Sequence, residues 1–175
     1  MAELVDARAL GARAERRAGP IPACGTKRSF MRRLFIIRKD LRLAPGKLAA
    51  MVAHCSEAFW TRLIAASSTP EGGAYRTSFM VDKATMEDYV RGSFVKTVCE
   101  AKNLNKLMKV EEIAKEMNLV KDVDYGFIDD ECRTDLTPEF TDENGKGYCR
   151  VGVWFRPLPD EDSHRLSKGY QLYRG

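Results

Sequence analysis

The segment Leu34–His54 constrains the fold of this chain more than any other stretch. It begins with a short apolar run, LFII, which continues into a basic loop and then into a helix that opens at Pro45-Gly46-Lys47. An apolar run bounded by charge is typical of a buried strand. Gly46-Lys47 places an ammonium group at the first helical turn, where unpaired backbone N–H groups already favour anions. The segment therefore predicts a strand-to-helix junction that binds a phosphate or a carboxylate.

The rest of the chain alternates patterns typical of strands and of helices. We expect strands at Arg33–Arg38, Ser93–Ala101, Val123–Ile128 and Tyr148–Phe155, and helices at Gly46–Ala66, Lys83–Val90, Asn105–Met117 and Glu161–Lys168. Asn103 is the expected N-cap of the third helix, and Asp142–Gly147 a hairpin turn because of its Asn-Gly core. The Ser/Gly/Pro-rich segment Ser67–Gly73 is an expected break. This order predicts a single α/β domain with a mixed sheet covered by helices.

Residues 1–30 differ in composition from the rest of the chain. They carry six basic and three acidic residues and no sustained apolar face, which fits a disordered basic leader. Neither a signal peptide nor a transit peptide matches this pattern. A further interpretation is a mis-assigned start, because Glu3–Ala7 and Gly19–Thr26 read like the translated D-arm and T-arm of a leucine-type tRNA gene. The domain proper then spans residues 31–175, beginning at Met31.

The overall charge does not argue for a nucleic-acid partner. The chain has 29 basic and 25 acidic residues, a net charge of +4, but without residues 1–30 the counts fall to 23 and 22. Any such argument therefore depends on a local patch. One basic patch, opposed only by Asp40, comprises Arg32, Arg33, Arg38, Lys39, Arg42 and Lys47. Its position at a strand end and a helix start favours a ligand over a merely solvated face.

Cysteine usage and hydropathy set the expected compartment. The five cysteines are widely spaced and include no CxxC pair, which argues against a disulfide framework and against a zinc site. No apolar stretch approaches the length of a membrane span. We therefore expect a reducing, cytoplasmic setting and no membrane partner.

A second charged cluster lies at Asp129–Asp135, DDECRTD. Adjacent carboxylates beside an arginine and a threonine can orient water, accept a proton and hydrogen-bond an ester or ribose oxygen. The same run also fits an acidic turn that pairs with its own arginine. On the helix that follows Gly46, the spacing of Lys47, Met51 and His54 places all three on one face, where a histidine also fits a packing role.

These motifs resemble those of the type II peptidyl-tRNA hydrolases, over roughly residues 31–173. The family's first motif is matched by Arg38-Lys39-Asp40-Leu41, Gly46-Lys47, Ala49-Ala50 and His54, and its second by Asp130, Arg133, Thr134 and Pro138. The resemblance implies a four-stranded mixed sheet with helices on both faces, commonly dimeric and without a cofactor or metal. It also implies hydrolysis of the ester between a peptide, or a blocked or misattached aminoacyl group, and the 3′ end of tRNA.

The resemblance also assigns roles to residues. Lys47 is expected to bind the tRNA end or to stabilise developing negative charge, and Asp130 to orient or deprotonate the attacking water. Thr134 is expected to hydrogen-bond the reacting group, and His54 to support the helix face as part of the catalytic set. The substrate-binding residues, which contact the 3′ end and the acceptor stem, are then Arg38, Arg42, Arg133 and Asp135.

Several positions depart from the family pattern. Met51 and Asp135 each stand where the family has Gln, Cys132 where it has Gly, and Glu139-Phe140 where it has Gly-Thr. The two lost amides remove donors, and a carboxylate at Asp135 repels phosphates. The alternative is therefore a non-catalytic tRNA- or RNA-binding relative of the same fold.

The segment Thr61–Gly92 is longer than the expected connection between a helix and the next strand. With the neighbouring Trp60 it carries the aromatic residues Tyr75, Phe79 and Tyr89. These side chains fit either a lid or base-stacking surface, or a satellite of the core.

Overall fold

The computed structural model describes residues 30–174, so the leader through position 29 and Cys24 lie outside the described residues. Within this range the main sheet has seven strands in the order β5-β7-β1-β4-β9, with β6 paired to β7 and β8 paired to β1. The four long strands are β1 (Met31–Arg38), β4 (Val95–Ala101), β5 (Tyr125–Asp130) and β7 (Gly147–Phe155). They correspond to the four strands expected from the sequence.

The expectation of a four-stranded sheet is wrong. Three two-residue strands join the sheet: β6 (Phe140–Thr141), β8 (Leu158–Pro159) and β9 (Gln171–Leu172). A strand of two residues is too short to show an alternating pattern, so only pairing with a longer neighbour reveals it. β8 follows β7 directly and pairs with the first residues of β1.

The strand directions bring three carboxyl ends to one edge of the sheet. β1 and β4 are parallel, with Arg38 opposite Ala101. β7 is antiparallel to both β1 and β5, so β5 runs in the same direction as β1. The loops that follow Arg38, Ala101 and Asp130 therefore lie along the same edge, where ligands of α/β sheets usually bind.

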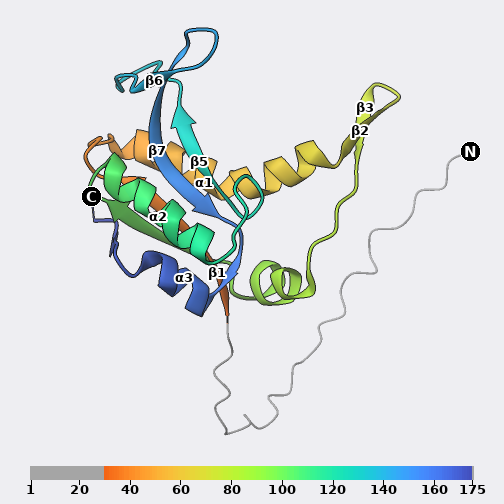
Figure 1. Ribbon diagram of the computed structural model, residues 1–175. Helices are drawn as coiled ribbons and strands as arrows, with labels where there is room; N and C mark the ends of the chain where they lie inside the picture. Colours follow the sequence, from red (N-terminus) through yellow and green to blue (C-terminus); the bar gives the residue numbers. More distant parts are fainter. Residues whose placement is uncertain (1–29, 175) are drawn as a thin grey trace, which may run out of the picture.

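Helices cover both faces of the sheet because successive side chains of β1 point to opposite sides. Phe35 and Ile37 pack on α1 (Pro45–Ala66), whereas Leu34 and Ile36 face α2 (Leu104–Glu116) and α3 (Asp160–Ser167). Figure 1 shows α1 on one side of the sheet and the other two helices opposite. The side chain of Asn103 accepts a hydrogen bond of 2.9 Å from the backbone N–H of Lys106, which confirms the expected N-cap.

The connection from α1 to β4 differs from its expected form. Where a break was expected, β2 (Ser68–Glu71) and β3 (Ala74–Thr77) form a hairpin that projects beyond the end of α1 (Figure 1). The expected helix at residues 83–90 is a π-type helix over Thr85–Ser93, η1, with a non-helical backbone at Gly92. Two aromatic side chains of this connection differ in exposure. Tyr89 is buried in the core, whereas Tyr75 on the hairpin is 71% exposed.

Arg33 was expected to be part of the basic patch, but its side chain is fully buried between β1 and α1. Its guanidinium donates to the backbone carbonyl oxygens of Phe155, Cys55 and Ser56. Burial lowers the pKa of Arg33 to about 10. Arg33 thus connects the middle of α1 to the sheet.

None of the helices within residues 30–174 has the length and apolarity that a membrane crossing requires.

A substitution of Gly152, in the middle of β7, tests how closely β7 packs against β1. A Cβ atom there would lie 2.9 Å from the backbone oxygen of Ile36 and 2.7 Å from the side chain of Ile37. We expect Gly152→Ala to lower the free energy of unfolding by about 1–3 kcal/mol, measured by urea denaturation. The matched control is Gly46→Ala, which meets no atom within 4 Å and is expected to be neutral or stabilising. Equal stability of Gly152→Ala and the wild type would contradict this packing.

Candidate active site

An ion pair between Lys47 and Asp130 forms the centre of the site. Lys47 lies in the first turn of α1, which begins at Pro45 without a side-chain cap and without an acidic residue in that turn. Asp130 is the last residue of β5. The ammonium Nζ of Lys47 lies 2.6 Å from Oδ2 of Asp130, and the side chains are 19% and 10% exposed. The junction expected to bind an anion therefore already holds a carboxylate of this chain.

The turn after β5 completes the arrangement. Oδ1 of Asp130 accepts a hydrogen bond of 2.9 Å from the backbone N–H of Cys132. Thr134 follows on the same turn, with its hydroxyl oxygen 3.5 Å from Nζ of Lys47. A carboxylate, an ammonium and a hydroxyl thus meet at one point, although Lys47 lies 83 residues before Asp130 in the sequence.

Lys47 and Asp130 lie on a cavity of about 620 Å³ between α1 and the end of β5. Its lining residues are Lys47, Met51, His54, Glu57, Ala58 and Thr61 from α1, and Phe127, Ile128, Asp129, Asp130, Glu131 and Arg133 from β5 and the turn after it. The lining contains four carboxylates, one lysine and one arginine. We call it the acidic cavity.

The structure brings together Lys47, Asp130, Thr134, His54 and Arg133 of the expected site residues. His54 is exposed on the α1 wall of the acidic cavity. Arg133 also lines the cavity and pairs with Glu131, 2.6 Å away. The face expected for Lys47, Met51 and His54 therefore turns toward the cavity, with Met51 only 3% exposed.

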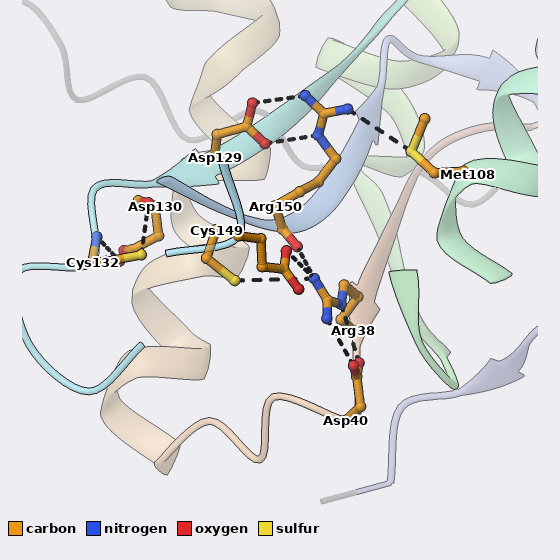
Figure 2. Close-up of polar contacts among 9 residues, drawn as sticks. Arg38, Asp40, Met108, Asp129, Asp130, Cys132, Cys149 and Arg150 are labelled. Atoms are coloured by element: carbon orange, nitrogen blue, oxygen red, sulfur yellow. Dashed lines mark hydrogen bonds and ion pairs between the residues drawn. The ribbon is translucent and has the colours of Figure 1, made fainter. Parts of the chain in front are cut away.

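Arg38 lies outside the acidic cavity, at the buried end of β1 (Figure 2). Its guanidinium donates to Asp40 at 2.7 Å, to Glu139 at 2.6 Å and to the backbone oxygen of Arg150 at 2.9 Å. Burial disfavours the charged form, but these carboxylates outweigh it and raise the pKa of Arg38. The side chain, 4% exposed, thereby connects the loop after β1 to the segment before β7.

Two other expected substrate-binding residues also lie away from the acidic cavity. Arg42, whose backbone is left-handed with φ 45°, lines a second cavity, which lies between the loops that follow β1 and β4. Asp135 is exposed beyond the turn and does not line the acidic cavity.

Arg150 on β7 is a residue that the sequence reasoning missed. Its guanidinium holds Asp129 in a bidentate pair of 2.8 and 2.9 Å and lies 3.9 Å from the sulfur of Met108 (Figure 2). This pairing raises the pKa of Arg150. The pair follows from the strand register, which places residues 129 and 150 opposite each other and becomes visible only in the structure. Asp129 is thereby neutralised beside Asp130, which leaves Asp130 as the carboxylate that Lys47 contacts.

The family model described as peptidyl-tRNA hydrolase PTH2 matches residues 31–173. The chain belongs to this family. No curated protein matches the chain. Among solved structures, one similar chain is a protein of unknown function, Atu0240, from Agrobacterium tumefaciens strain C58, at 11% sequence identity and a TM-score of 0.41. That similarity covers 82% of this chain and 98% of the other, and it carries no inference about function.

The departures of this PTH2 member have structural consequences. Cys132, at the position of a family Gly, has φ 52°, in the left-handed region that favours glycine. Glu139, at another Gly position, supplies one of the carboxylates that hold Arg38. Met51, at a Gln position, packs in the core between α1 and the sheet. The first two substitutions therefore alter the turn and its anchoring, and the third removes an amide from the cavity wall.

The left-handed backbone of Cys132 predicts a gain in stability on substitution by glycine. We expect Cys132→Gly to raise the free energy of unfolding by up to about 1 kcal/mol, because the strain removed exceeds the added chain entropy of glycine. Thermal and urea denaturation measure the change. Cys132→Ser keeps the Cβ atom and serves as the control, for which no gain is expected. A greater loss of stability in Cys132→Gly than in Cys132→Ser would contradict the prediction.

The pairing of Glu139 with Arg38 predicts a pH-dependent stability. Hydrogen bonding to Arg38 lowers the pKa of Glu139 in the folded state, so the pair stabilises the fold above the ordinary glutamate pKa of about 4.3. This contribution is lost as the pH falls from about 5 through the lowered pKa. We expect Glu139→Gln to be less stable at pH 7 and to lose less stability than the wild type on acidification, measured by urea denaturation across pH. Glu143→Gln, an exposed neighbour on the same hairpin, should retain the wild-type pH profile.

Proposed function

We propose that this protein hydrolyses the ester between a peptide, or a blocked or misattached aminoacyl group, and the 3′ end of tRNA. Membership of the PTH2 family supports a reaction of this class. The observation that carries the proposal is the contact of Lys47 with Asp130 on the wall of the acidic cavity, beside the hydroxyl of Thr134. Ester hydrolysis needs an activated water and a group that stabilises the developing oxyanion, and these residues supply both.

Asp130 is proposed as the general base. Each carboxylate oxygen has more than one acceptor position, so Asp130 can accept a water proton while it keeps its contacts with Lys47 and Cys132. The water oxygen then forms a bond to the carbonyl carbon, and the carbonyl oxygen takes up the negative charge. When the tetrahedral intermediate collapses, the bond to the tRNA 3′-oxygen breaks, and the protonated Asp130 returns its proton to that oxygen.

Lys47 is proposed as the electrostatic group. In the resting site its charge is balanced by Asp130 at 2.6 Å. Protonation of Asp130 removes that balance at the moment when the carbonyl oxygen becomes negative, so the ammonium becomes available to the oxyanion. The two residues therefore act as one unit, and loss of either is expected to remove most of the catalysis.

The surrounding residues are proposed to position the substrate. The hydroxyl of Thr134 is in place to hydrogen-bond the reacting group, and His54 supports the α1 wall of the acidic cavity. Arg133, which is paired with Glu131, holds the turn. We propose Arg38 as a positioning residue, because its donors are directed to Asp40, Glu139 and the backbone of Arg150.

Single-turnover hydrolysis of diacetyl-Lys-tRNA tests the proposal. We expect Lys47→Ala and Asp130→Asn each to lower the rate by about 10²–10³-fold, because each removes one half of the coupled pair. Thr134→Ala should lower the rate by a smaller factor. Matched controls are Lys83→Ala and Asp88→Asn, which make comparable changes in charge on an exposed segment outside the acidic cavity and should retain the wild-type rate.

The same assay separates this proposal from a non-catalytic RNA-binding relative. Such a relative would bind tRNA with a strong salt dependence but release no free tRNA from the ester. Folded wild-type protein, shown by cooperative thermal unfolding, that binds tRNA without hydrolysis in a single turnover would overturn the enzyme proposal.

A further inference from the structure

A second cavity, of about 670 Å³, lies at the same edge of the sheet as the acidic cavity. Lys39, Arg42, Lys102 and Asn105 contribute to its walls from the loops after β1 and β4 and from the start of α2. The chain leaves β1 toward the face covered by α1 and leaves β4 toward the face covered by α2. Neighbouring parallel strands whose connections diverge in this way leave a crevice in which α/β proteins bind ligands.

The charges that line this second cavity are mainly positive, so we call it the basic cavity. Its five cations are Lys39, Arg42, Lys102, Lys106 and Lys109, and its two carboxylates are Asp40 and Glu100. Both carboxylates already have partners, since Asp40 pairs with Arg38 and Glu100 with Lys39. Over residues 30–174, the other four cations form no ion pair with a carboxylate.

One of these cations is held in a defined place. Nζ of Lys106 lies 4.9 Å from the centre of the Tyr170 ring, and the phenol of Tyr170 donates to the backbone oxygen of the same lysine at 2.7 Å. A Cβ atom at Gly169 would lie 3.0 Å from that ammonium, so the absence of a side chain there gives it room. The C-terminal segment therefore positions a positive charge in the basic cavity without neutralising it.

The two cavities are complementary in charge. The acidic cavity has four carboxylates and two cations in its lining, and both cations are already paired, Lys47 with Asp130 and Arg133 with Glu131. Its lining therefore offers no unpaired cation to phosphates. The basic cavity attracts them. β5 and β4 are separated by two intervening strands, so the carboxyl ends of these two strands lie roughly 14 Å apart along the edge at a strand spacing of about 4.8 Å. A short single-stranded stretch of RNA can span this distance.

We propose that the basic cavity binds backbone phosphates of the tRNA acceptor end, a few nucleotides from the ester bound at Lys47. This inference rests on the proposed function for the identity of the RNA. Lys102, Lys106, Lys109 and Arg42 contact the phosphates, and the acidic cavity receives only the terminal ester. Affinity for the nucleic acid and chemistry on the ester are thereby assigned to different cavities on one edge of the sheet.

Binding of deacylated tRNA to the full chain tests the inference, with the double variant Lys102→Glu/Lys109→Glu. Both lysines are exposed, so the fold should be retained, which thermal unfolding verifies. We expect Kd to rise at least about tenfold near 0.1 M salt, and the slope of log K against log salt concentration to become shallower by about 1.5, corresponding to two lost phosphate contacts. Lys102→Gln/Lys109→Gln should show the same change in slope with a smaller loss of affinity.

The control is Lys83→Glu/Arg91→Glu, which makes the same change in net charge. These residues belong to the segment around η1, where Ser93 contacts Met31 at the opposite end of β1. The control should bind tRNA within about twofold of the wild type and with the same salt slope. An equal loss of affinity in both double variants, or wild-type binding by Lys102→Glu/Lys109→Glu, would overturn the inference.

Two further measurements separate the possible causes of failure. Titration with AMP or inorganic phosphate identifies a small-anion site: tight binding of these probes that depends on Lys102 and Lys109, with unchanged tRNA binding, would overturn the inference. Wild-type hydrolysis is measured separately in the single-turnover assay. Absence of turnover there contradicts the proposed function, whereas unchanged binding of deacylated tRNA by the double variant contradicts the basic cavity, because that binding needs no chemistry.

Discussion

The antiparallel placement of β7 between β1 and β5 is the constraint on which the rest of the structure depends. It gives β5 the same direction as β1 and β4, so that the three carboxyl ends meet at one edge. Asp130 ends β5 there, and Lys47 opens α1 close to the end of β1. Without this strand order, the ammonium and the carboxylate would lie at opposite edges of the sheet, and their contact of 2.6 Å would be impossible.

Ion pairs with arginine then keep the loops of this edge in place. The buried guanidinium of Arg38 joins the loop after β1 to Glu139 and to the backbone of β7, and Arg150 holds Asp129. A buried arginine is costly unless its donors are satisfied, so removal of one partner destabilises more than the pair itself contributes. Glu139 occupies a position where the family pattern has glycine, which means that this chain anchors the loop through a side chain of its own.

The edge also separates charges according to the steps of the proposed reaction. A general base needs a carboxylate with a free acceptor position, whereas a polyanion is held by cations that are not already paired. The acidic cavity and the basic cavity meet these two requirements at neighbouring positions on the same strands. The net charge of about +1 beyond residue 30 offers no general attraction for RNA. The basic cavity provides a local attraction instead.

The sequence by itself determined the four long strands, the three α-helices, the cap at Asn103 and the family, because these depend on local periodicity and on motifs of short range. It also singled out Lys47, Asp130 and Thr134, through motif resemblance rather than through spacing. Only the tertiary structure decided the seven-stranded sheet, the burial of Arg33 and Arg38, and the position of Arg42 on the basic cavity, away from the acidic cavity. Two-residue strands and the burial of a charge leave no periodic signal, since both arise from contacts between residues that are distant in the chain.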